Sequence, residues 1–169
     1  MRTYSGMVTI TVEEREFIEK TIKECKECFI GLIDTDGLPY VIPMNFGYKD
    51  DVVYLHSGPE GAAVRAIENN PNICITFCTP SEITHQHEEV ACSYRVKGSS
   101  VVCRGKVTFI EDFNEKVEIL NILMEQYSDR PFKYSEPAVR NVKIWKVPVD
   151  KVTGKVFGVP YKESHHYKK

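Results

Sequence analysis

The sequence has little that would direct it to a nucleic acid or a membrane. Its net charge is only −2 and it contains no run of five basic residues, so it lacks the positive surface typical of nucleic-acid-binding proteins. No apolar stretch approaches the roughly 20 residues of a membrane helix, and the N-terminus has no signal-peptide pattern. We therefore expect a cytoplasmic protein with neither nucleic acid nor membrane among its partners.

The chain also lacks internal repeats and any shift in composition that would mark a second domain. Its 169 residues suffice for one domain with a buried core. Hydrophobic residues make up 42% and charged residues 27%, which is typical of globular proteins. We predict a single domain over residues 1–169, with its core at about 10–155 and a C-terminal tail at 156–169.

Six cysteines are present, but a second zinc-binding pair is missing. Cys25 and Cys28 form a CxxC pair, a spacing found in zinc and redox sites. A zinc ribbon needs another pair at comparable spacing. A thioredoxin-type pair would open a helix, whereas this pair closes a predicted one. We favour structural cysteines and keep a metal or redox protein based on this pair as an alternative.

Turn signals and hydrophobic periodicity predict short strands with a few helices between them. Thr11 and Glu14 have capping-box spacing, which predicts a helix that runs to about Glu27. Asp36-Gly37 predicts a hairpin turn, Lys49-Asp50-Asp51 predicts a second turn, and Asp112 and Glu115 have the spacing of another capping box. Further strands are predicted at 29–35, 38–48, 52–56, 73–78, 99–110 and 142–149, helices at 61–69 and 114–127, and a loop at 130–139. Residues 80–98 give no clear pattern.

Six or so strands joined mostly by tight turns predict a mainly β fold of the α+β class. We expect a small closed antiparallel barrel with helices packed on its outside. Pro39 and Pro43 cannot donate hydrogen bonds to a neighbouring strand, so the strand at 38–48 is predicted to be an edge strand or irregular.

The segment His56-Ser57-Gly58-Pro59-Glu60-Gly61 lies where a predicted strand ends and a predicted helix begins. Backbone N–H groups concentrate at such a junction and favour an anion. Ser57 and Gly58 can offer further donors, and Gly61 lets the backbone approach a ligand closely. Arg65 lies one turn into the helix and suits a phosphate. The alternative is an ordinary connection with a surface arginine.

Other candidate sites carry weaker patterns. His85, His87 and Cys92 could bind a metal, although an HxH in a polar loop more often faces solvent, and we predict no metal site. Trp145, the single tryptophan, is interpreted as a core or interface residue, with stacking near a cofactor as the alternative. Lys155 follows Thr-Gly but lacks the rest of a P-loop.

Four segments in this order resemble the pyridoxamine-phosphate-oxidase-like flavin proteins, and most of all their nitroimidazole-resistance (Nim) branch. The segments are GLPYVIPMNFGY, VVYLHSGPEGAAVRAIENNPNICITF, SSVVCRGKVTFIED and VPVDKVTGK. The resemblance covers roughly residues 10–155. It implies a six-stranded antiparallel split β-barrel of the FMN-binding type, a homodimer, and one FMN in each of two clefts between the subunits.

The resemblance also implies which residues meet the cofactor. His56 matches a histidine that Nim proteins carry near the substrate, which gives it a catalytic role. The helix start would take the flavin phosphate, and strand segments would border the ring. The implied cofactor-binding residues are Pro43, Met44, Asn45, His56, Ser57, Gly61, Ala63, Arg65, Ser100 and Val101.

The sequence departs from the family pattern at three positions. Ala63 stands where members usually carry a lysine, so FAD is an alternative to FMN. Gly98 replaces an aromatic residue, and Ile42 replaces an arginine of true pyridoxamine-phosphate oxidases, which argues against vitamin B6 oxidation. The implied function is a flavin-binding oxidoreductase that reduces nitroaromatic or other small molecules; the alternative is a non-catalytic flavin-binding, storage or sensor protein.

Overall fold

A computed structural model of the chain describes residues 7–160, which fold into two compact units. Unit 1 contains residues 7–25, 77–102 and 152–160, and unit 2 contains residues 26–76 and 103–151. Two long strands, β8 and β10, have residues in both units. The single-domain organisation stays a prediction, and the end of the expected tail, 161–169, lies outside the described residues.

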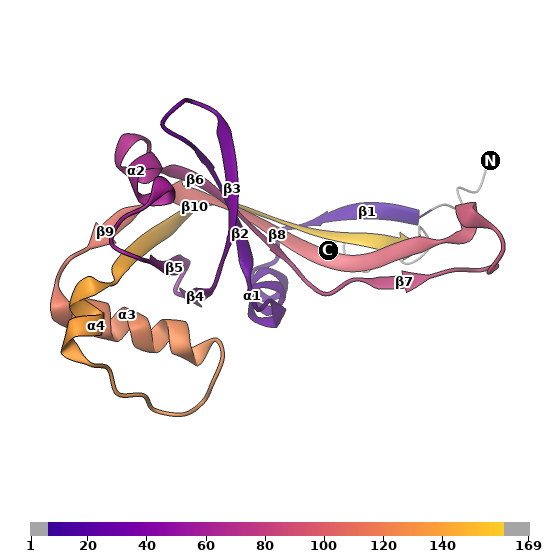
Figure 1. Cartoon of the computed structure of the whole chain (residues 1–169). Helices are drawn as coiled ribbons and strands as arrows, with labels where there is room; N and C mark the ends of the chain where they lie inside the picture. Colours follow the sequence, from indigo (N-terminus) through magenta and orange to yellow (C-terminus); the bar gives the residue numbers. More distant parts are fainter. Residues whose placement is uncertain (1–6, 161–169) are drawn as a thin grey trace. The chain divides into compact units, whose positions relative to one another are not determined.

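The described residues form ten strands and four α-helices, which confirms the predicted α+β class (Figure 1). The strands are β1 Met7–Val12, β2 Cys28–Ile33, β3 Pro39–Met44, β4 Phe46–Lys49, β5 Val52–Ser57, β6 Asn72–Cys78, β7 Glu82–Thr84, β8 Arg95–Lys106, β9 Thr108–Ile110 and β10 Lys143–Pro160. The helices are α1 Arg15–Glu24, α2 Ala62–Asn69, α3 Phe113–Glu125 and α4 Glu136–Asn141, with a 3₁₀ turn at Ala91–Ser93.

In unit 2, β2 pairs antiparallel with both β3 and β6, and β5 pairs antiparallel with both β4 and β10. The two predicted tight turns are present. Gly37 has φ 81°, and Asp50 and Asp51 have φ 51° and 60°, the left-handed backbone that such turns require. Among the described strands, the proline-containing strand β3 pairs only with β2 and ends the strand order, as an edge strand should.

The predicted strand 38–48 is interrupted at Asn45. The backbone N–H of Phe46 donates to the hydroxyl of Tyr127 at 3.0 Å, and this hydroxyl donates to the carbonyl of Lys26 at 2.8 Å. A side chain from beyond α3 thus takes a donor that a continuous strand would have used. The prediction missed this break because Tyr127 is about eighty residues away in sequence.

Helix α3 packs against β4 and contributes Ile119 and Leu123 to the core of unit 2. An added Cβ on Gly47 would lie 3.0 Å from the backbone of Ile122, so only glycine allows the helix to approach the strand this closely. Asp112 caps α3 as predicted, because its carboxylate accepts from the N–H of Glu115 at 2.8 Å. The core here includes Ile110, Ile119, Leu123 and Ile144.

In unit 1, β1 pairs antiparallel with the last part of β10, as Figure 1 shows for the indigo and yellow strands. Ile10, Val12, Val156 and Val159 form a buried cluster on this pair. The expected helix start at Thr11 is therefore wrong, since Thr11 belongs to β1. Helix α1 begins at Arg15 after Glu14 without a side-chain cap, and it ends at Glu24 instead of about Glu27.

Three other boundaries differ from prediction. The expected strand 99–110 begins earlier, at Arg95, and divides into β8 and β9. The expected loop 130–139 contains the start of α4, which Pro137 opens in the first turn, where proline is tolerated. The last strand continues from Val149 to Pro160, because pairing with β1 supplies backbone partners that the sequence pattern did not reveal. Within residues 7–160, no helix is long and apolar enough to span a membrane.

Candidate functional site

The connection from β5 to α2, called here the β5–α2 junction (residues 56–65), contains five of the predicted site residues. They are His56, Ser57, Gly61, Ala63 and Arg65. Gly61 has φ 145° and ψ 175°, a backbone conformation that essentially only glycine adopts. Its carbonyl accepts the N–H of Arg65 at 3.1 Å and so starts the helix. The glycine is needed for its backbone angles, since an added Cβ would have no atom within 4 Å.

The first turn of α2 is suited to an anion. No side chain of residues 7–160 caps its N-terminus, and its first turn carries no acidic residue. By helix geometry, the N–H groups at 62–64 have no partner within the helix, and the helix dipole adds partial positive charge there. Arg65 is exposed on the next turn, whereas Ala63 is half-buried. These residues fit a phosphate group, which would meet backbone donors and one guanidinium.

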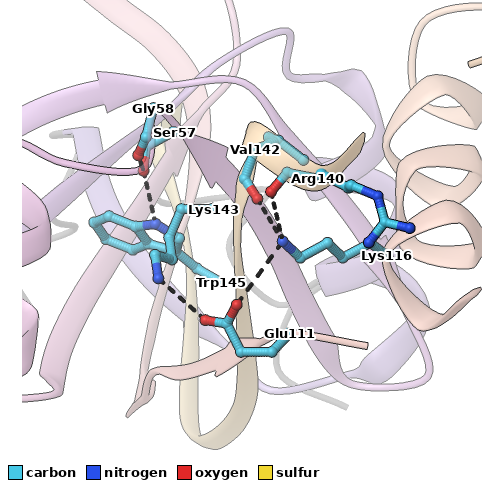
Figure 2. Close-up of polar contacts among 8 residues, drawn as sticks. All are labelled: Ser57, Gly58, Glu111, Lys116, Arg140, Val142, Lys143 and Trp145. Atoms are coloured by element: carbon cyan, nitrogen blue, oxygen red, sulfur yellow. Dashed lines mark hydrogen bonds and ion pairs between the residues drawn. The ribbon is translucent and has the colours of Figure 1, made fainter. Parts of the chain in front are cut away.

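The Ser57 side chain is held in place by a hydrogen bond from Trp145 of β10. The indole Nε1–H of Trp145 donates to Ser57 Oγ at 3.0 Å, and Ser57 Oγ donates to the carbonyl of Gly58 at 2.8 Å (Figure 2). Trp145 is fully buried, which confirms its interpretation as a core residue. The expectation that Ser57 offers a side-chain donor to a ligand does not match this arrangement, because the hydroxyl hydrogen already points to Gly58.

A second polar group holds the start of β10, two residues before Trp145. Lys116, only 4% exposed, donates from Nζ to the carbonyl of Val142 at 2.9 Å and to that of Arg140 at 3.5 Å. Glu111 joins the group, with its carboxylate 3.1 Å from Lys143 Nζ and 4.0 Å from Lys116 Nζ (Figure 2). A buried ammonium needs such partners, and here they tie α3 to the end of α4 and the start of β10.

His56 lies at the end of β5, opposite Ile144 of β10. The residue is exposed, yet partial burial of its side chain lowers its pKa from the usual 6.5. The imidazole is therefore neutral near neutral pH. In this form one ring nitrogen donates and the other accepts a hydrogen bond.

Three more predicted residues lie on a different segment of unit 2, at the end of β3. Pro43 is exposed and faces Phe29 across the strand pair, while Met44 is half-buried and its carbonyl lies 3.5 Å from the thiol of Cys28. The amide of Asn45 is turned toward Lys26, whose carbonyl accepts from Nδ2 at 3.3 Å. The backbone of this edge strand is thus available for a ring to border, while the Asn45 amide is occupied.

The last two predicted residues, Ser100 and Val101, belong to β8 in unit 1. Val101 is fully buried, so only its backbone could meet a ligand, whereas Ser100 is half-buried. The preceding Ser99 is fixed by Thr79, whose hydroxyl accepts its N–H at 3.0 Å. Close by is a cavity of about 250 Å³ lined by Phe17, Lys20, Thr21, Glu24, Lys97, Gly98, Ser99 and Val156. The sequence reasoning missed this cavity because its walls come from three separate segments.

The weaker candidates show no site within residues 7–160. No group of three or more histidine, cysteine or acidic side chains there could hold a metal ion. The His85–Tyr94 loop (residues 85–94) instead makes contacts within the loop. Ser93 donates to the carbonyl of His87 at 2.7 Å, and the His85 ring stacks on the Tyr94 ring with 4.7 Å between the centroids. The thiols of Cys25 and Cys28 are buried, in line with structural roles.

Comparisons with known proteins place the chain in a family. A family model described as pyridoxamine 5'-phosphate oxidase matches residues 14–156. A solved structure of a candidate 5-nitroimidazole antibiotic resistance protein from Bacteroides thetaiotaomicron is 52% identical, with 90% of this chain and 89% of that chain covered and a TM-score of 0.82. A search of curated proteins gives no match.

More distant structures share the fold. The flavocytochrome Anf3 from Azotobacter vinelandii is 19% identical, with a TM-score of 0.75 over 94% of this chain and 76% of that chain. An FAD and heme binding protein from Mycobacterium smegmatis is 14% identical, with a TM-score of 0.78 over 92% and 78%. The chain belongs to the pyridoxamine 5'-phosphate oxidase family, within its nitroimidazole-resistance-like branch.

Proposed function

We propose that this protein is a flavin-dependent oxidoreductase that reduces a small molecule, with nitroaromatic compounds as the leading substrate class. The observation that carries the proposal is the uncapped start of α2 behind Gly61, whose backbone donors suit a phosphate, in a protein of this family. The relative from Bacteroides thetaiotaomicron, at 52% identity, supports nitroimidazoles as the compounds to test first.

We assign the phosphate of FMN to the N–H groups at 62–64 and to the guanidinium of Arg65. The backbone of Pro43, Met44 and Asn45 would border the flavin ring in unit 2, whereas the role of Ser100 and Val101, which belong to unit 1, stays a prediction. FAD is the alternative cofactor, because Ala63 provides no cation where relatives usually carry a lysine, and the name of the FAD and heme binding protein from Mycobacterium smegmatis supports it.

When bound, the flavin supplies hydride and single-electron transfer, and the protein binds and orients the reactants. His56 is the chain's own candidate for a proton step. Its lowered pKa leaves an unprotonated ring nitrogen near neutral pH, which can accept a hydrogen bond or proton while the other nitrogen donates. Ser57 and Trp145 act behind it by holding the backbone of the β5–α2 junction.

We further propose a homodimer with the flavin at the subunit interface. The outer face of the β2–β3 hairpin supports a second copy as its partner. Phe29 and Val41 are 43% and 63% exposed, and the strand register places Pro43 and Pro39 on the same face. A continuous exposed apolar face of this kind marks an interaction surface. Changing Val41→Glu should convert a dimer to a monomer in light scattering; a wild-type chain that is already monomeric would refute the dimer.

The function is tested with the purified chain and added FMN. The expected result is a stoichiometric flavin complex whose visible absorption is bleached by a nicotinamide cofactor and returns when a nitroimidazole is added. His56→Ala should lower turnover more than FMN affinity, with His85→Ala as the matched control on an exposed loop. Turnover that is unchanged at saturating FMN would remove His56 from catalysis.

The same experiment separates the alternative function. A chain that binds flavin tightly, yet neither accepts electrons nor passes them to a nitro compound, would be a storage or sensor protein. A chain that binds neither FMN nor FAD would overturn both functions.

A further inference from the structure

The hydroxyl of Ser57 has a single hydrogen, and that hydrogen is already used. It is directed at the carbonyl of Gly58, while the oxygen accepts the indole N–H of Trp145. Ser57 therefore has no hydrogen left for a phosphate. Its contacts instead connect the buried core under β5 with the loop that leads to α2.

We propose that Trp145 is a positioning residue for the anion-binding start of α2, acting through Ser57 on the carbonyl of Gly58. The inference rests on the proposed function, because the anion in question is the flavin phosphate. Trp145 itself contacts no phosphate in this assignment.

Trp145 can hold the Ser57 hydroxyl in place because its own side chain is fixed by packing. It is fully buried, stands opposite Leu55 in the β5–β10 register, and packs edge-to-face with the Phe109 ring at 5.8 Å between centroids. A buried N–H without an acceptor is costly, so the indole favours the one rotamer of Ser57 that accepts its hydrogen.

Register explains why the indole reaches Ser57. In this antiparallel pair Lys143 stands opposite Ser57 and Trp145 opposite Leu55, so Trp145 is the diagonal neighbour of Ser57 on the same face. The Lys116 and Glu111 contacts hold Val142 and Lys143, directly before this point on β10. The strand start and the serine are therefore fixed together.

The path from Gly58 to the helix is short and stiff. Fixing the Gly58 carbonyl fixes the peptide plane that enters Pro59, whose ring in turn restricts φ. Only Glu60 then separates Pro59 from Gly61, whose φ of 145° is followed directly by α2. A serine that rotates freely would loosen this path and misalign the N–H groups that face the phosphate.

The test compares FMN with riboflavin, which has the same ring system but no phosphate. Trp145→Phe keeps an aromatic ring and removes the N–H. We expect it to weaken FMN binding by about threefold to tenfold, the loss typical of one hydrogen bond, and to leave riboflavin binding unchanged. Ser57→Ala should have the same effect, and the double variant should bind FMN no more weakly than the worse single variant.

Phe109→Leu is the matched control, because it removes packing from Trp145 and leaves the indole N–H in place. It should lower stability without changing the ratio of FMN to riboflavin affinity. The single tryptophan provides a readout that needs no flavin: Ser57→Ala should shift its emission in the flavin-free protein, since the indole N–H loses its acceptor.

The outcomes separate the two proposals. A wild-type chain that binds none of FMN, FAD and riboflavin overturns the proposed function. A wild-type chain that binds FMN, combined with an unchanged affinity ratio in Trp145→Phe or additive losses in the double variant, overturns the positioning role alone. Equal wild-type affinity for FMN and riboflavin also overturns it, because the phosphate would then gain nothing from the start of α2.

Discussion

The β5–α2 junction and the His85–Tyr94 loop both contain residue types found in binding sites. They differ in the contacts that hold these residues in place. Behind the junction stand a fully buried tryptophan and a buried lysine with hydrogen-bond partners. The loop is mostly exposed, and its hydrogen bonds run within itself, from Ser93 to His87 and from Tyr94 to Glu88. Reactive residue types alone do not make a site; they need fixed partners that aim them outward.

The largest expected loss of stability and FMN affinity comes from a change in the backbone of the β5–α2 junction. Gly61→Ala forces a side chain onto φ 145° and should cost about 1–3 kcal/mol of stability, with a marked loss of FMN affinity. Gly58→Ala is the control, since an added Cβ there is 3.8 Å from the nearest atom, the Glu60 carbonyl oxygen, at an ordinary φ. Urea unfolding and FMN titration measure both. Equal losses in the two variants would show that the φ of Gly61 is not what matters.

The next effect concerns the buried support. Lys116→Met leaves the carbonyls of Val142 and Arg140 without this donor and should cost about 1–3 kcal/mol in urea unfolding. Lys146→Met is the matched change at the surface. It removes the 3.1 Å ion pair with Glu115, which is more than a third exposed, and should cost less than about 1 kcal/mol. Equal stability of the two variants would show that the buried Lys116 does not hold the start of β10 as inferred here.

A smaller effect follows from the lowered pKa of His56. The unfolded chain takes up the proton near pH 6.5 and the folded chain only below that, so the unfolded state binds more protons in this window. The stability contribution is complete above pH 6.5 and is lost as the pH falls through the folded pKa. His56→Gln should remove this part of the acid destabilisation. NMR titration of the imidazole checks the direction directly, and a folded pKa above 6.5 would contradict it.

The smallest expected effect is in the His85–Tyr94 loop. Added zinc should leave the melting temperature unchanged, because no suitable ligand group exists among residues 7–160. The same measurement on His87→Ala serves as reference. A zinc-dependent rise in melting temperature that disappears in this variant would put a metal site in the loop after all.

Local signals predicted much of the fold. Asp36-Gly37, Asp50-Asp51 and the Asp112 cap are short-range features, and all are found where expected. The errors lie where contacts with residues far away in sequence determine the local structure. Thr11 has good capping chemistry, but pairing of β1 with β10 takes it into a strand. The break at Asn45 depends on Tyr127, a residue far along the chain.

In the candidate site, too, a local feature could be predicted from the sequence and a long-range contact could not. A strand ending before glycines and a short helix identified the β5–α2 junction from sequence, because helix N-termini bind anions through their backbone. The link from Trp145 to Ser57 was not predictable, since it joins residues 88 apart and depends on the register of β5 with β10. Trp145 lies in the segment 142–149, whose pattern indicated a strand and nothing about the partner of the indole.

Strand β10 has a consequence for how the length of this chain can vary. Its first part is in register with β5 around Trp145 and its last part with β1 around Val156. Side chains along a strand alternate between faces, so deleting one residue between Pro148 and Gly154 would turn every later residue to the opposite face. Gly154 would no longer meet Val12, whose carbonyl lies 2.7 Å from where its Cβ would be. Insertions and deletions should therefore be confined to turns such as Lys49–Asp51, and a tag or linker belongs there rather than in the strand.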